Sequence, residues 1–299
     1  MATLLMYLET SGQQDPIFTQ YMFNTQAVNP AYAGIWKNQG FFALVRKQWT
    51  GVQTGPLTEM VSLFSSLKND NVGVGFNVIK DRFSKEERLS FFGDYSYEIL
   101  LRYDIHFRMG LKFGFMKFQN ALTEYQLIDN QPDPAFQEDI DLKFLPNVGV
   151  GGFLYTDHYY FSFSIPKLIE NNFLPNRSNY SSLAEVRHFY CSSGYVFNLG
   201  YLLKFKPTVM FRVTLGAPVN MDIGTNFLLY DRLWLGAMYR SSDAVCFIAQ
   251  WMINNNMKIG YAMDVTMSDL YRHQSGTYEF TFSYDLDLKG RRYNRRKYF

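Results

Sequence analysis

Apolar and polar side chains alternate with a period of two through residues 105–118, and the same pattern, less regular, runs through residues 89–103. The apolar set is Ile105, Phe107, Met109, Leu111, Phe113 and Phe115, and the intervening set is His106, Arg108, Gly110, Lys112 and Gly114. A period of two is typical of a β-strand. With only Asp104 between them, the two halves are predicted to form a long hairpin that has one apolar face and one polar face.

The apolar face of this hairpin is rich in aromatic residues, while the other face carries charge and glycine. Both predicted strands are longer than the roughly 9–11 residues that a tilted strand needs to cross a bilayer. This pattern is typical of an outer-membrane barrel, which is apolar towards lipid and polar towards its lumen. We therefore expect Lys at position 113 to impair assembly by about 2–4 kcal/mol, and we expect Lys112→Ala to be tolerated.

A soluble β-sandwich is the alternative, and the lengths of the connections argue against it. The strand-like runs are 40–49, 57–68, 71–80, 89–103, 105–118, 146–156, 157–167, 186–198, 200–214, 219–229, 232–241, 244–254, 256–266 and 276–286. Connections after even-numbered runs are very short, whereas those after odd-numbered runs include 81–88, 119–145, 168–185 and 267–275. We therefore predict an all-β fold, a transmembrane outer-membrane β-barrel of about 14 antiparallel strands, with short periplasmic turns, longer extracellular loops and both termini periplasmic.

Composition agrees with this prediction. The chain has 299 residues, including 28 Phe and 22 Tyr, an excess that suits strands and interfacial girdles. Its mean hydropathy is −0.19, and no run of 18 apolar residues predicts a transmembrane helix. A net charge of +2 gives no reason to expect a nucleic-acid partner, so outer-membrane lipid is the expected environment.

The chain divides into four predicted regions. Residues 1–13 resemble the remnant of an export signal, although they lack a basic start. Residues 14–39 are a periplasmic or plug segment, residues 40–286 form the barrel, and residues 287–299 are a basic periplasmic tail. The tail is either a solvated end or a contact for an acidic partner.

No constellation of residues predicts catalysis. The four histidines lack the spacing of metal ligands, the acidic loop 119–145 lacks the EF-hand pattern, and no GxSxG, HExxH or P-loop motif occurs. We therefore expect no catalytic residue, no metal, no cofactor and no enzymatic activity. Cys191 and Cys246 are either a disulfide or two buried thiols, and the absence of a disulfide framework favours thiols.

Three sequence blocks near the start of the chain stand out. Residues 14–24 read QDPIFTQYMFN, residues 28–34 read VNPAYAG, and residues 46–49 read RKQW. Together they resemble the opening of the PorP/SprF family of outer-membrane proteins of type IX secretion and gliding. Similar pieces recur later, including NVGVG at 147–151 and SIPKL at 164–168, so the resemblance spans about residues 14–286. The motif residues proposed to dock a partner are Asp15, Pro16, Gln20, Tyr21, Asn24, Asn29, Pro30, Gly34, Arg46, Gln48 and Trp49.

The first two blocks also have a physical interpretation. Proline fixes its own φ and restricts the residue before it, so Asp15-Pro16 and Asn29-Pro30 predict turns. The aromatic residues between them are expected to pack at the periplasmic mouth or against the lumen wall, as a plug or as a docking site for a partner. Arg46 and Gln48 share one face of the first strand, and Trp49, on the other face, is expected in an extracellular interfacial girdle.

The resemblance implies a non-enzymatic barrel in the bacterial outer membrane that assists export and surface anchoring of adhesins through their C-terminal domains. It also implies contact with periplasmic lipoprotein components of the secretion machinery. Aromatic anchors for such partners are expected in the extracellular loops, at Tyr125, Phe136, Phe144, Phe173 and Tyr180. The main rival function is a porin or solute channel, and a third possibility is an outer-membrane hydrolase.

Overall fold

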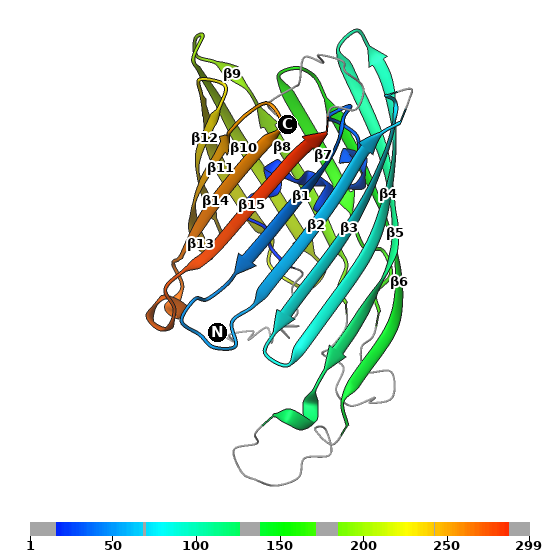
Figure 1. Ribbon diagram of the computed structural model, residues 1–299, viewed down its shortest axis with the longest axis vertical. Helices are drawn as coiled ribbons and strands as arrows, with labels where there is room; N and C mark the ends of the chain where they lie inside the picture. The colour runs from blue at the N-terminus through cyan, green and yellow to red at the C-terminus, as the bar shows by residue number, and fades with distance from the viewer. Residues whose placement is uncertain (1–15, 68–69, 126–137, 172–184, 242, 287–299) are drawn as a thin grey trace, which may run out of the picture.

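The strands close into a barrel. In a computed structural model, the described residues are 16–67, 70–125, 138–171, 185–241 and 243–286. Neighbouring strands are antiparallel, and β10 pairs with both β8 and β11, so the sheet has no free edge (Figure 1). The strands are β1 Gln39–Lys47, β2 Leu57–Ser66, β3 Val72–Phe83, β4 Glu86–Arg102, β5 Ile105–Asn120, β6 Ile140–Tyr155, β7 Tyr159–Ile165, β8 His188–Tyr195, β9 Phe197–Asn198, β10 Leu203–Thr214, β11 Asn220–Leu229, β12 Leu233–Arg240, β13 Ala244–Met252, β14 Met257–Thr266 and β15 Thr277–Leu286.

The barrel has 14 strands, as predicted. β9 pairs with the start of β10 and β8 with its end, so β8 and β9 are two pieces of one strand. The first and last strands meet, with Gln39 opposite Leu286 and Lys47 opposite Tyr278. Among the described residues, no helix is long and apolar enough to cross a membrane.

Short turns, such as that between β4 and β5, lie at the upper end of Figure 1, and the 3-10 helix η4 (Leu122–Glu124), which follows β5, lies at the lower end. The predicted loop 81–88 is wrong, because β3 continues to Phe83 and β4 begins at Glu86. Glu87, predicted in this loop, instead forms a cross-strand pair with Lys80 at 3.0 Å. These strands therefore continue beyond the apolar part of the wall.

A second boundary differs at β6, which begins at Ile140 rather than Pro146. Pro146 lies inside the strand, opposite Phe115, directly beside a register shift between Met116 and Phe118. A bulge frees one strand from the regular ladder, so a proline is tolerated next to it.

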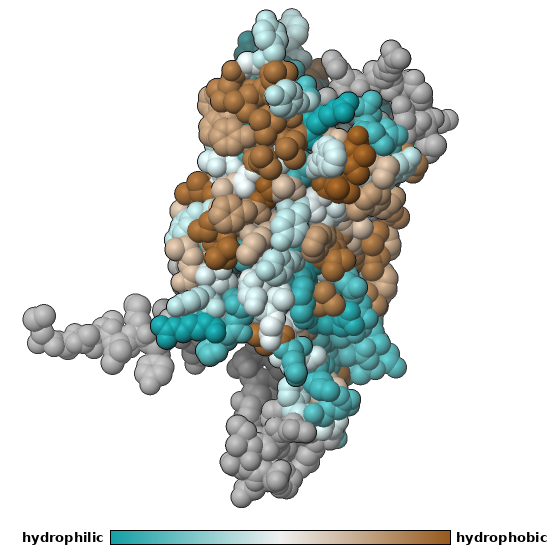
Figure 2. Space-filling view, turned by 60° about the vertical axis from the view of Figure 1, so that its left-hand side comes forward, coloured by the Kyte–Doolittle hydropathy of each residue, from teal (hydrophilic) through white to brown (hydrophobic). Residues whose placement is uncertain are grey.

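The two faces of the wall are those that the alternation predicts. Met109, Leu111 and Phe113 point outward and are 46 %, 56 % and 59 % exposed, whereas Arg108 and Lys112 are buried inside. Figure 2 shows hydrophobic side chains over the upper and middle parts of the visible face and hydrophilic ones over its lower part. The buried inward charges carry both signs. They are Arg46, Asp94, Glu98, Arg108, Lys112, Lys206, Arg212, Asp222, Arg240, Asp264, Glu279 and Asp285.

Residues 16–38, the plug segment, lie inside the barrel. They contain three short 3-10 helices, η1 Tyr21–Phe23, η2 Thr25–Ala27 and η3 Pro30–Tyr32, drawn in dark blue in Figure 1. The sequence left open the periplasmic mouth and the lumen wall as the place of this segment, and it packs against the lumen wall. Thr19 contacts Glu279, near the lower start of β15, and the chain then crosses the lumen to reach β1 at the upper end.

The two cysteines are free thiols, so the disulfide alternative is wrong. Cys246 on β13 is fully buried on the inner face, opposite Asp264. Cys191 on β8 lies opposite Phe211 and Phe163, whose side chains are exposed on the outer face. The wall separates the two sulfur atoms, and their strands are not neighbours.

Candidate functional site

The interface between the plug segment and the barrel wall gathers most of the motif residues singled out in the sequence. Seven of them are buried in it: Gln20, Tyr21, Asn24, Asn29, Pro30, Gly34 and Arg46. Pro16 is half-buried at the lower end, Gln48 and Trp49 follow the end of β1, and Asp15 lies outside the described residues. Side chains buried at this interface hold the plug segment and are not presented to a partner at the surface.

The lower end of the plug segment is held by a clamp of four residues: Thr19, Arg46, Asp264 and Glu279. Arg46 donates hydrogen bonds to Thr19 Oγ1 at 2.9 Å, to Asp264 Oδ2 at 2.7 Å and to Glu279 Oε2 at 3.2 Å. The Thr19 hydroxyl donates to Asp264 at 2.8 Å, and its backbone N–H donates to Glu279 Oε2 at 2.9 Å. One buried cation thus joins β1, β14, β15 and the plug segment.

The clamp continues around the wall as a chain of alternating charges. Arg240 Nη1 lies 3.3 Å from Asp264 Oδ2, and Arg240 Nε lies 3.4 Å from Asp222 Oδ1. Arg212 in turn donates to Asp222 Oδ1 at 2.9 Å. Removing one member of a buried ion pair costs much more than the pair contributes, because the remaining charge is left without compensation. The network therefore fixes where the plug segment binds rather than adding much net stability.

Amide side chains hold the middle of the plug segment. Gln26 donates to Asp94 Oδ2 at 3.1 Å, and Asn24 donates to Ser62 Oγ at 3.0 Å. Lys112 lies 3.3 Å from Asp94 Oδ1 and also donates to the backbone carbonyl of Gln26 at 3.3 Å. Lys112 is therefore a bound partner of Asp94 and of the plug segment, and these contacts lead us to expect that Lys112→Ala is harmful, in place of the tolerance expected from the sequence.

Asn29 caps η3 and also binds the wall. Its Oδ1 accepts from the Ala31 N–H at 2.9 Å, while its Nδ2 donates to Ser162 Oγ at 2.8 Å and to the Gly152 carbonyl at 3.1 Å. Pro30 occupies the first position of η3, where a missing N–H costs nothing. The Asn-Pro dipeptide thus starts the helix and anchors it to β6 and β7 at the same time.

Gly34 ends this turn with φ of +72°, a conformation that a residue with a Cβ rarely adopts. A Cβ there would lie 2.6 Å from Gly73 Cα on β3. The preceding carbonyl, of Ala33, accepts hydrogen bonds from Arg108 at 2.9 Å and from Ser96 at 2.6 Å. Arg108 also donates to Glu98 at 2.7 Å, so a second buried ion pair holds the upper half of the plug segment.

Glycines on the wall make room for the plug segment. A Cβ on any of five inward-facing glycines would overlap atoms of the plug segment. Gly73 faces the Ala33 carbonyl, Gly75 the Gln26 side chain, Gly110 the Ala31 backbone, Gly151 the Asn29 side chain and Gly260 the Gln20 side chain. The plug segment therefore approaches several strands more closely than any larger residue would permit.

The sequence pointed to the residues that the plug segment contributes to this interface but not to those that the barrel wall contributes. Asp264 and Glu279 lie at inward positions of β14 and β15, and nothing in the sequence near them pairs them with Thr19. The useful signal was glycine at inward positions of strands, such as Gly110 between Arg108 and Lys112, which marks close approach of another backbone.

The predicted loop anchors separate into three cases. Phe144 is not in a loop: it lies in β6 and packs on Phe115 of β5 with ring centroids 5.1 Å apart. Tyr125 is half-buried just after η4, Leu122–Glu124. In the same region, Thr123 donates through its N–H and hydroxyl to Asp139, which lowers the pKa of that carboxyl. The other three anchors, Phe136, Phe173 and Tyr180, lie outside the described residues.

No metal site emerges within the part of the chain that the structure describes, since no group of three or more His, Cys, Asp or Glu side chains is placed to hold an ion. The inward carboxylates that we have described are instead engaged by arginine, lysine and amide groups. The geometry of the interface is that of a bound internal segment.

Comparison with solved structures identifies outer-membrane barrels at low sequence identity. Omp33 of Acinetobacter baumannii is 8 % identical with a TM-score of 0.49, over 84 % of this chain and 100 % of its own. The CymD monoaromatic hydrocarbon channel is 8 % identical with a TM-score of 0.49, over 91 % and 94 %. A Pseudomonas aeruginosa FadL homologue is 10 % identical with a TM-score of 0.47, over 92 % and 96 %.

No match was found among curated proteins. A family model, described as type IX secretion system membrane protein PorP/SprF, matches residues 10–284. Because this match extends over nearly the whole chain, the protein belongs to the PorP/SprF family and lies in the bacterial outer membrane.

Proposed function

We propose that this secretion-associated barrel acts by recognising proteins at its two rims and does not conduct solutes through its lumen. Its clients are adhesins, which it helps to export and then anchors at the cell surface through their C-terminal domains. On the periplasmic side it contacts lipoprotein components of the type IX machinery. Its role is not enzymatic.

The observation that supports this proposal is the filled lumen. Residues 18–35 of the plug segment are buried, apart from the half-buried Phe23, and hydrogen bonds tie them to strands on opposite sides of the barrel. A solute channel of this strand number needs a continuous aqueous path, and a segment held at several points across the lumen opposes one. We therefore assign the binding of partner proteins to the two rims of the barrel.

The lower rim is suited to contact outside the bilayer. β2, β3 and β4 carry charged pairs on their outer surface there, namely Arg82 with Glu59 at 3.1 Å and Lys80 with Glu87 at 3.0 Å. The connection between β5 and β6 begins with η4 and carries Tyr125. In the usual orientation of such barrels the long connections face the medium, so we place the adhesin on this rim.

Two measurements test this function together. Purified full-length protein in planar bilayers is expected to show no stable conductance, and it is expected to co-purify with the C-terminal domain of its client adhesin. Replacing Tyr125 by Ser should weaken that co-purification, whereas Tyr103→Ser, on the turn between β4 and β5 at the opposite rim, should not. A large, stable conductance without adhesin binding would favour the porin and end this proposal.

A further inference from the structure

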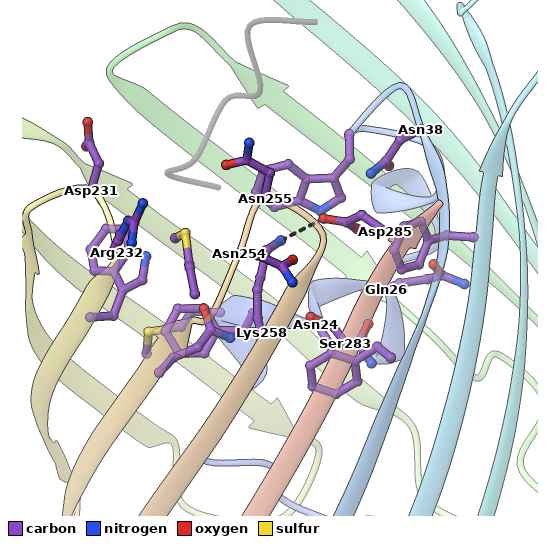
Figure 3. A pocket seen from close by; sticks show the side chains of 18 of the residues that line it. Asn24, Gln26, Asn38, Asp231, Arg232, Asn254, Asn255, Lys258, Ser283 and Asp285 are labelled. Carbon is purple, nitrogen blue, oxygen red and sulfur yellow. Dashed lines mark ion pairs between the residues drawn. The ribbon is translucent and has the colours of Figure 1, made fainter. Parts of the chain in front are cut away.

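A cavity of about 330 Å³ lies between the plug segment and the wall at the end of the barrel with the short turns. The turns at Asp231 and Arg232 and at Asn254 and Asn255 border it, as does Asn38 just before β1 (Figure 3). Pockets for specific ligands begin at about 300 Å³ and combine an apolar lining with a few placed polar groups. The cavity is thus large enough for one bulky side chain, with an entrance on the periplasmic side in the proposed orientation.

Its apolar lining comes from the plug segment and the wall together. Met22 and Phe23 belong to η1, Phe42 to β1 and Trp234 to β12, and the rings of Phe23 and Trp234 pack with centroids 6.3 Å apart. The site exists only while the plug segment is in place.

Two polar side chains that line the cavity are buried but lack hydrogen-bond partners within the described part of the chain. Gln250 is 4 % exposed and Ser283 is 7 % exposed, and no hydrogen bond to either side chain is found among the described residues. Polar groups inside proteins are nearly always satisfied by protein, ordered water or ligand. The Gln250 amide and the Ser283 hydroxyl keep some exposure in the cavity, so they offer both donors and acceptors to whatever enters.

The charged residues that line the cavity number two of each sign, and Asp231 among them pairs with Lys204, outside the lining, at 2.6 Å. Lys258 pairs with Asp285 at 3.2 Å, shown by the dashed line in Figure 3, and its ammonium lies 5.1 Å above the ring of Trp36. Arg232 and Asp231 are adjacent on the neighbouring turn. A strongly charged ligand gains little here, whereas an uncharged group with amide hydrogen-bonding capacity matches the lining.

The entrance continues into exposed apolar surface. Tyr230, which lines the cavity, is 67 % exposed, and its N–H donates to the carbonyl of Leu202, itself 58 % exposed. Tyr201 beside it is fully exposed. Apolar surface at the tips of turns beyond the cavity exceeds what a small solute would contact, and such patches mark protein or membrane interaction sites.

We propose that this cavity binds an uncharged peptide segment of a periplasmic protein, with one bulky apolar side chain inserted and the peptide backbone hydrogen-bonded to Gln250 and Ser283. The inference rests on the proposed recognition role and adds the chemistry of the periplasmic partner. The exposed turns at Tyr201 and Tyr230 extend the contact to the residues flanking that side chain.

The test uses full-length protein with Asn255→Cys at the entrance as a reporter of maleimide labelling. The probes are the blocked tripeptides acetyl-Gly-Phe-Gly-amide and acetyl-Gly-Glu-Gly-amide, together with toluene. The phenylalanine peptide is expected to slow labelling saturably, and the other two probes to be at least about tenfold weaker, because each lacks either the apolar side chain or the amides. The unsubstituted chain gives the background from Cys191 and Cys246.

A matched pair of variants tests the polar contact. Gln250→Leu keeps the size of the side chain and should raise the concentration for half-protection about tenfold. Gln119→Leu, on β5 at the other end of the barrel, should leave it unchanged. Absence of saturable protection indicates a cavity that holds water only, and equal protection by toluene indicates a site for small apolar solutes; either result overturns the inference.

The two proposals fail separately. A barrel that conducts no solute but shows no protection of the Asn255→Cys reporter refutes the peptide site alone. A conducting barrel that still shows peptide protection refutes the closed-lumen role and leaves the site intact.

Discussion

Gly110 on β5 leaves no space for a side chain beside Ala31, because a Cβ at position 110 would overlap the backbone of the plug segment. Gly110→Val is therefore expected to displace η3 from the wall, and overpacking of this kind costs about 1–3 kcal/mol. Thermal unfolding in detergent measures the loss, and the appearance of conductance in planar bilayers reports displacement of the plug segment.

The control for this change is Gly152→Val on the next strand. A Cβ at Gly152 meets only the ring of Phe107, at 3.4 Å, on the outer face. The Gly152→Val variant should therefore have stability and conductance close to those of the wild type. Equal behaviour of the two variants would show that the plug segment does not bind where we place it.

Thr19→Val removes the hydroxyl at the centre of the clamp and keeps the shape of the side chain. Arg46 and Asp264 then each lose a hydrogen bond in a buried site, and we expect a loss of about 1–3 kcal/mol. Thr225→Val on the outer face of β11 is the matched control, since its hydroxyl makes only a long contact of 3.5 Å. Intermittent channel openings specific to Thr19→Val would support the clamp, and identical traces would argue against it.

Asn29→Asp keeps the oxygen that caps η3 but replaces the amide that donates to Ser162 and to Gly152. A buried carboxylate facing a carbonyl is unfavourable, so this variant should unfold at a lower temperature, and raising the pH should widen the difference because the new group ionises. Asn198→Asp, on the exposed strand β9, should change little. A difference independent of pH would contradict this account.

Phe113→Lys places a charge on the lipid-facing surface and should cost about 2–4 kcal/mol, measured by refolding into lipid vesicles, with Phe113→Leu as its control. Insertion of Phe113→Lys with unchanged stability would reverse the assignment of faces.

Lys112→Ala should also be harmful, because it leaves Asp94 buried without its ion partner, a change that typically costs about 3–5 kcal/mol. The double variant Lys112→Ala with Asp94→Ala should recover part of the loss. No recovery would mean that the contact of Lys112 with the plug segment, and not the ion pair, dominates.

The thiols provide a simple check of the wall. Denatured protein should titrate two free thiols, and in folded protein Cys246 should resist alkylation because it is completely buried. A band that changes mobility on reduction would contradict the free pair.

The barrel itself was predictable because lipid on one side and a polar interior on the other force side chains to alternate. Phe113 and Lys112 are neighbours in sequence and already reveal opposite faces. Strand ends were less predictable: Arg82 and Glu87 were predicted to lie in a loop, yet they belong to strands that leave the bilayer while still paired. The polarity of the side chains indicates where a strand leaves the membrane, whereas the strand itself ends where its backbone pairing with the neighbouring strand ends.

Only one side of the interface between the plug segment and the wall could be predicted from the sequence. Asn29-Pro30 and Gly34 carry local backbone signals, so the turn was visible before the structure. Their partners, Ser162 and Gly73, become neighbours only through closure of the sheet, and no short-range pattern records such distances. Glycines at inward-facing strand positions were the one sequence signal for the barrel-wall side of this interface.

The hydrogen bond from Thr19 to Glu279 joins positions 260 residues apart. Such a long loop is expensive in chain entropy to close, and contacts of this kind form late. The carboxylate that receives Thr19 belongs to the final strand, and Arg46 of β1 binds the same carboxylate, so the clamp is complete only when these two strands have paired. The last step that seals the ring is therefore also the step that fastens the lower end of the plug segment.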